Sequence, residues 1–163
     1  MDDGDESPNV RASSYLLARS TRHCGHCGRQ THVFAIILPA GHETLGVEDD
    51  PCADEWEVSP APTLLSHVSS LSAPDPECLR ALAPGYRLDH GRTAEGPYWM
   101  NHCEHCEAPL ADVDTVEEYD SAFNPARPEG AAAIVLRELS GPFAARCGAN
   151  TEDLPSFEAM RRA

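Results

Sequence analysis

The pattern of apolar and polar positions predicts a series of short strands. The clearest lies at 31–38, where β-branched and aromatic residues dominate and the run stops at Pro39. Its nearly unbroken apolar character indicates burial on both faces, so we expect this strand in the middle of a sheet. Weaker patterns predict strands at 13–19, 55–58, 86–89 and 97–100, and an exposed strand within 110–119.

Helix signals are fewer and shorter. Asp75 can cap a helix, Pro76 suits its first position, and the Pro-Gly pair at 84–85 ends it. The segment 129–139 predicts one helical turn leading into a strand. In 63–71 the leucines and Val68 lie at helical offsets, but the serines among them are poor helix formers, so helix and strand both stay open.

Composition agrees with short elements joined by many turns. The 163 residues include fourteen prolines and eleven glycines, and only 6% are aromatic. We therefore expect an α+β fold, mostly β, with one or two short helices in a single domain over 13–147. The segment 1–12 is predicted to be a disordered acidic tail, and 148–163 a loosely ordered one.

Charge narrows the choice of partners and compartment. Acidic residues outnumber basic ones 27 to 12, giving a net charge of −15, which opposes binding to nucleic acid or to an anionic membrane. A basic protein surface is the better expectation. No apolar run approaches membrane-spanning length, the first residues are acidic, and the cysteines number seven, an odd count. We expect a soluble cytoplasmic protein in a reducing compartment.

Two His-Cys-x-His-Cys stretches, at 23–27 and 102–106, carry the candidate chemistry. Two residues between paired cysteines let one tight turn direct both sulfur atoms to a common point, and two such turns supply four soft ligands. The sequence predicts one structural Zn²⁺, because four thiolates leave no coordination position for a reactive water. The predicted ligands are Cys24, Cys27, Cys103 and Cys106.

The residues around the cysteines are less symmetric. Gly28 follows the first pair, where a turn with positive φ favours glycine, but Glu107 occupies the matching position. Either Glu107 keeps a negative φ or the turn costs on the order of 1 kcal/mol. The flanking histidines are interpreted as exposed or as hydrogen-bonding around the thiolates rather than as ligands, although their roles stay open. They are His23, His26, His102 and His105.

This ligand pattern resembles the zinc-ribbon class, in which two cysteine turns on β-hairpins clamp one zinc ion. The stretch 98–106 also resembles that of uncharacterised bacterial zinc-ribbon proteins. The resemblance covers the turns and their flanking strands, and it implies metal-clasped hairpins. Zinc ribbons serve nucleic-acid binding, transcription and adaptor roles, so the class does not choose among them. Together with the acidic net charge, the resemblance favours a non-enzymatic protein-interaction or regulatory module.

Two other functions stay open. Cys24-Gly25-His26-Cys27 is also the tetrapeptide of thioredoxin-fold oxidoreductases, with Cys24 attacking and Cys27 resolving, although those enzymes need a helix where this chain predicts a strand. Nucleic-acid binding would need a local basic face, for which the candidates are Arg11, Arg19, Arg22 and Arg29.

Catalysis has little positive support in the sequence. Cys52, Cys78 and Cys147 lack the local signature of a cysteine protease, so we interpret them as small buried apolar side chains. Common hydrolase, phosphate-binding and dinucleotide-binding motifs are absent from the sequence. Whether the protein is an enzyme is left open, with the balance against it.

Overall fold

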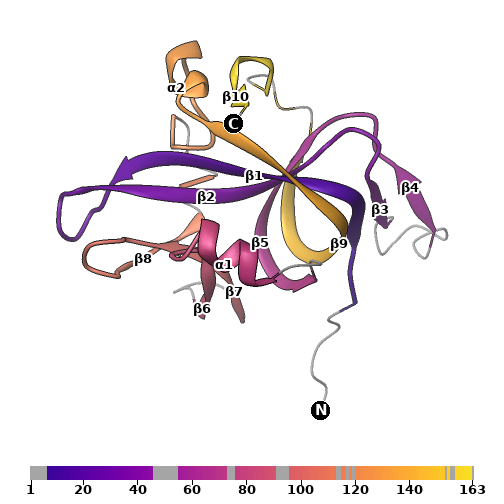
Figure 1. The fold of residues 1–163 in the computed structure, drawn as a ribbon, viewed down its shortest axis with the longest axis horizontal. Coiled ribbons are helices and arrows are strands. Elements are labelled where there is room, and N and C mark those ends of the chain that lie inside the picture. Colours follow the sequence, from indigo (N-terminus) through magenta and orange to yellow (C-terminus); the bar gives the residue numbers. More distant parts are fainter. Residues whose placement is uncertain are drawn as a thin grey trace.

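A computed structural model shows a sheet of ten strands with two short α-helices among the residues that it describes (Figure 1). These residues are 7–45, 55–72, 76–90, 96–112, 115–116, 118, 120–152, 154 and 157–162. The strands are β1 (Val10–His23), β2 (Gln30–Leu38), β3 (Glu43–Leu45), β4 (Trp56–Val58), β5 (Thr63–Ser72), β6 (Arg87–His90), β7 (Pro97–His102), β8 (Pro109–Leu110), β9 (Val135–Glu152) and β10 (Arg161–Arg162). The helices are α1 (Pro76–Leu82) and α2 (Pro128–Ala132), followed late in the chain by a 3₁₀ turn, η2 (Phe157–Ala159).

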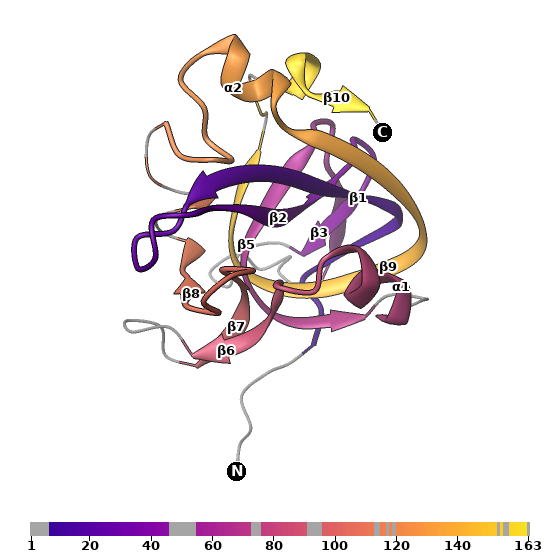
Figure 2. The ribbon, with the colours of Figure 1, turned by 60° about the vertical axis from the view of Figure 1, so that its left-hand side comes forward.

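The long strand β9 closes part of the sheet into a ring. The main strand order is β10-β9-β1-β2-β5-β7-β6, and β9 also pairs with β5. Residues 135–145 of β9 lie against β1, and residues 144–152 lie against β5. Figure 2 shows β9 as one curved ribbon running round the β1–β2 pair. The strands β9, β1, β2 and β5 therefore form a small closed barrel.

One glycine is required where β9 bends past β1. The β1–β9 register shifts between Ala12 and Ser14. A Cβ atom on Gly141 would lie 2.3 Å from the carbonyl oxygen of Ser13, a distance that real Cβ contacts do not reach. Only glycine fits this close approach of the two backbones.

The middle of β1 and most of β2 are buried on both faces. Leu17 and Ile36 belong to one core cluster, which also contains Leu79 of α1 and Ala83 just after that helix. The alternate residues Leu16 and Ile37 belong to the second cluster, together with Val116, Phe123 and Ile134 from the segment that precedes β9. The prediction that 31–38 is a central strand buried on both faces is confirmed.

The fold is mostly β with two short helices, as the sequence predicted. Helix α1 matches the segment predicted from 75 to 83, although Asp75, the proposed cap, lies outside the described residues. The ambiguous segment 63–71 is strand β5, because it forms ladders with both β2 and β9. The helical turn that leads into a strand over 129–139 is confirmed by α2 and β9.

The prediction of an exposed strand within 110–119 is wrong. Of its described residues only Leu110 belongs to a strand, β8, and Val116 is buried in the second core cluster. Ordered strands also extend into both predicted tails, since β1 begins at Val10 and β9 continues to Glu152. The division into one domain and two tails stays a prediction. In the described part of the chain, no helix is long and apolar enough to cross a bilayer.

Candidate metal centre

The four predicted ligands meet between two hairpin tips. Cys24 and Cys27 lie in the turn between β1 and β2, and Cys103 and Cys106 lie in the turn between β7 and β8. Figure 1 shows these two tips side by side at the left of the molecule. The four Sγ atoms all lie within 4.8 Å of one another. The fold therefore brings together two cysteine pairs that have 75 residues between them in the sequence.

Two of the distances between the sulfur atoms match those of a tetrahedral metal site. The Sγ atoms of Cys24 and Cys106 are 3.6 Å apart, and those of Cys27 and Cys103 are 3.7 Å apart. An ion with four metal–sulfur distances of about 2.3 Å would hold its sulfur atoms about 3.8 Å apart. A disulfide would need about 2.05 Å. The four cysteines could therefore bind one metal ion.

The two cysteine turns have the same backbone hydrogen bonds. The amide of Gly28 donates to the carbonyl of Cys24, and the amide of Glu107 donates to the carbonyl of Cys103, both at 2.9 Å. Next to each of these bonds, an amide donates to the sulfur of the first cysteine. His26 donates to Cys24 at 3.3 Å, and its counterpart His105 donates to Cys103 at 3.4 Å.

The cluster has a buried side and an open side. Cys24 and Cys103 are buried, with 2% and 1% of their surface exposed, whereas Cys27 and Cys106 are exposed. The first cysteine of each turn therefore faces the core and the second faces solvent. Sulfur ligands in this arrangement are fixed by the fold but can still receive an ion from solution.

Backbone amides favour the thiolate form at the buried positions. Hydrogen bonds from the amides of Cys27 and His26 lower the pKa of the Cys24 thiol. Burial opposes ionisation of Cys103, but hydrogen bonds from the amides of Cys106 and His105 and from the thiols of Cys27 and Cys106 outweigh it and bring the pKa of Cys103 down to about 6. The thiolate is the form of cysteine that binds metal ions.

Cys106 behaves differently from the two buried cysteines. The Ala108 amide lowers the pKa of Cys106, but desolvation and the sulfur atoms of Cys24, Cys103 and Cys27 outweigh that bond and raise the pKa to about 11. Four thiolates at this spacing repel one another, so without a metal ion the cluster keeps a proton among its sulfur atoms. Metal binding would release it.

Asn101 joins the two hairpins through its buried side chain. Its Nδ2 donates to the carbonyl of Phe34 at 2.8 Å, and its Oδ1 accepts from the amide of Phe34 at 2.7 Å. The carboxamide therefore replaces a neighbouring strand at this point of β2. Asn101 is only 1% exposed, so both bonds form in a site sheltered from water.

Other side chains complete the contact along the same edge of β2. The Glu104 amide donates to Oγ1 of Thr31 at 3.0 Å, and the Glu104 carboxylate accepts from the amide of His32 at 2.9 Å. Nε2 of His105 lies 3.0 Å from the carbonyl oxygen of Gln30. The second cysteine turn thus binds β2 over its first five residues. This contact gives the two pairs of ligands a fixed relative position.

The four flanking histidines have different environments. His23 and His26 are exposed, and the ring of His105 binds the β2 backbone. His102 is 2% exposed; its Nδ1 lies 2.9 Å from the Gly85 carbonyl oxygen, and its Nε2 lies 2.7 Å from a carboxylate oxygen of Asp89. That bond to His102 lowers the pKa of Asp89. His102 therefore fixes the turn between α1 and β6, a role that the sequence pattern does not reveal.

The backbone after each cysteine pair has positive φ. Gly28 has φ 77°, and Glu107 has φ 64°, so the two turns are symmetric and the glutamate carries the strain. Replacing Glu107 with glycine is expected to raise the free energy of unfolding by about 0.5–1 kcal/mol. Replacing Gly28 with alanine is expected to lower it by about 1 kcal/mol. Urea unfolding of both variants and of the wild type checks these two expectations. Free energies of unfolding equal to that of the wild type would contradict the assignment of backbone strain to Glu107.

The structure gives little support to the two alternative functions, thiol-disulfide exchange and nucleic-acid binding. A strand, β2, follows Cys27, so the helix N-terminus that activates a thioredoxin-type cysteine is missing there. Arg11 and Arg22 lie roughly 36 Å apart along β1. The Arg11 guanidinium is 2.8 Å from Glu43 and lies over Trp56, while Arg22 donates to Thr115 at 3.0 Å. These arginines do not form one basic face.

Two of the solitary cysteines, Cys78 and Cys147, lie outside the cluster of four. Cys147 is buried in the first core cluster, as expected for a small apolar side chain. Cys78 is only partly buried, and Cys52 lies outside the described residues. Comparison of the chain with protein-family models, with curated protein sequences and with solved structures finds no match. Its function is inferred from its own geometry.

Proposed function

We propose that the protein is a non-enzymatic zinc-binding module, with Cys24, Cys27, Cys103 and Cys106 as the ligands of one structural Zn²⁺. The observation that carries the proposal is the meeting of four Sγ atoms within 4.8 Å. Soft thiolates at tetrahedral spacing suit zinc. Four of them complete its coordination, so the ion would stabilise the fold rather than activate a water. When bound, zinc neutralises thiolate charge and ties the two hairpins together.

The proposed setting is the cytoplasm, and the proposed partner is a protein. A reducing compartment keeps the four sulfur atoms available as thiolates. The net charge of −15 favours a basic protein surface over nucleic acid or membrane. The zinc-ribbon resemblance of the two cysteine turns is consistent with an adaptor or regulatory role, since many proteins of that class bind other proteins.

Metal analysis with thiol titration tests the proposal. Protein purified without added zinc is expected to contain about one equivalent of zinc, and four of its seven cysteines are expected to become reactive only after chelation. Less than half an equivalent of zinc would contradict the proposal. Rapid alkylation of Cys24 in folded, metal-free protein would instead favour a thiol-disulfide oxidoreductase that uses Cys24 and Cys27.

A further inference from the structure

The ladder between β1 and β9 opens before β1 ends. The last pair is Arg19 with Val135, yet β1 continues to His23. Continuing the same register would place Ala133 opposite Thr21. Ala133 instead ends α2 with φ −79° and ψ −13°, a helical conformation that cannot extend the ladder. The outer edge of β1 therefore loses its neighbouring strand at Thr21.

The alternation of an antiparallel ladder shows which way the Thr21 backbone points. Phe34, opposite Arg19, directs its amide and carbonyl to Asn101 and away from β1. Thr21 is two residues further along, opposite His32, whose amide likewise points away from β1 to Glu104. The amide and carbonyl of Thr21 must then point away from β2. Among the described residues they have no backbone partner.

A pocket of about 400 Å³ lies at this open edge. Thr21 lines it on one side, and the small residues Ala122, Gly130 and Ala133 line it on the other. Ser121 also lines it, and the Oγ atom of Ser121 is buried without a hydrogen-bond partner among the residues that the structure describes. The volume is within the usual range of ligand sites, and small side chains leave the strand edge accessible.

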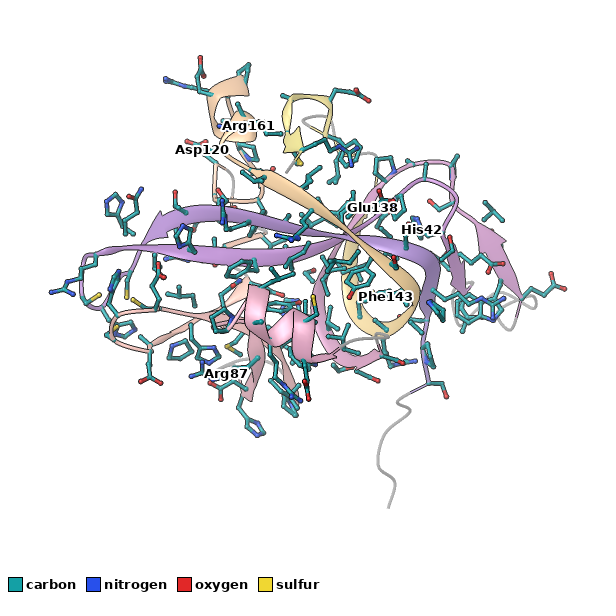
Figure 3. The ribbon with its side chains drawn as sticks, viewed as in Figure 1. His42, Arg87, Asp120, Glu138, Phe143 and Arg161 are labelled. Atoms are coloured by element: carbon teal, nitrogen blue, oxygen red, sulfur yellow. The ribbon has the colours of Figure 1, made fainter. Side chains whose placement is uncertain are left out.

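The pocket is lined by one positive and one negative side chain, Arg22 and Asp120, and the strong acidity of the whole chain favours a basic ligand. Arg22 is held by the His23 carbonyl and by Thr115, at 3.2 and 3.0 Å. The carboxylate of Asp120 is exposed on the opposite wall, beside the segment that leads to α2 (Figure 3). One of its oxygen atoms accepts from the amide of Ala126, and the carboxylate has no ion pair with the described residues. The whole chain is also strongly acidic.

We propose that the open edge of β1 at Thr21 docks an extended, basic peptide segment of a partner protein. The peptide backbone pairs with the amide and carbonyl of Thr21, a small side chain enters the pocket, and a basic side chain faces Asp120. The inference rests on the proposed function as a binding module, because it names the surface that would bind. The neighbouring cysteine turn begins at Cys24, so metal binding would also steady this wall of the pocket.

The test uses the full, zinc-loaded chain and a phage-displayed library of random heptapeptides. Selected peptides are expected to be basic and to slow hydrogen exchange of the Thr21 amide at least about tenfold. Thr21→Pro removes the outward amide at an edge position where proline is tolerated, so it should weaken binding at least about tenfold. Thr21→Val keeps the amide and should change affinity less than about threefold.

Several results would overturn the docking proposal. These are a selection that enriches no peptide over a control protein, peptides that bind Thr21→Pro as well as wild type, or exchange protection at another edge. A dimer that Thr21→Pro dissociates would assign the edge to a second copy instead. If Thr21→Pro does not fold, Ala133→Trp, which fills the pocket from an exposed position, replaces it and must abolish binding.

Zinc content measured on the same samples separates the two proposals. Zinc-loaded protein that binds no peptide contradicts only the docking site. Protein that holds no zinc but binds peptides at Thr21 contradicts the metal assignment and leaves the docking site in place.

Discussion

Replacing Cys103 with serine is expected to abolish zinc binding and to lower the free energy of unfolding by at least about 4 kcal/mol. Cys103 is 1% exposed and receives a hydrogen bond from the His105 amide, so its sulfur is held in place before any ion binds. A serine hydroxyl is a poor zinc ligand at neutral pH. The variant would keep three sulfur ligands, which cannot complete the coordination shell of the ion. The two hairpins would then no longer be joined through a metal ion.

Urea unfolding and metal analysis of the same preparations measure both effects. Cys78→Ser is the matched control, because Cys78 is partly exposed and lies outside the cluster of four. That control should retain about one zinc and stay within about 1 kcal/mol of wild type. A Cys103→Ser protein with unchanged unfolding would count against a structural metal.

Replacing Asn101 with leucine is expected to lower the free energy of unfolding by about 3 kcal/mol, because both backbone groups of Phe34 would be buried without partners. We also expect weaker zinc affinity, because the hydrogen bonds between Asn101 and Phe34 set the distance between the two cysteine turns. Leucine branches at the same carbon as asparagine, although its larger methyl groups would add an overpacking contribution to the loss.

Denaturant unfolding with and without zinc measures this second effect. Asn124→Leu is the control, because Asn124 is exposed and its side chain donates a long bond of 3.4 Å to the carbonyl oxygen of Glu118. It should change stability by no more than about 0.5 kcal/mol. Wild-type stability and zinc affinity in Asn101→Leu would show that the bridge does not hold the hairpins together.

The cluster of four cysteines could be predicted because its signal is local. Each pair of cysteines is set by one turn, and the apolar run of 31–38 fixes the strand behind the first turn. The contact between the turns could not be predicted in the same way. Asn101 and Phe34 are 67 residues apart, and a single asparagine beside a cysteine turn gives no sign of its partner.

Long-range pairing also decided the segments that the sequence left ambiguous or that we predicted wrongly. Leu64 and Leu65 fit helical offsets, but β5 is extended because β2 and β9 supply its hydrogen bonds. In 110–119 the acidic residues suggested an exposed strand. Leu110 and Val116 instead pack in the second core cluster. Local charge was a poor guide there, because the apolar positions determined burial.

Zinc K-edge X-ray absorption on the purified protein tests the central claim most directly. One zinc per chain with four sulfur neighbours at about 2.3 Å is the predicted result, because all four ligands in the cluster are cysteines. A first shell containing nitrogen or oxygen neighbours would contradict the four-cysteine site. So would a sample with less than half an equivalent of zinc.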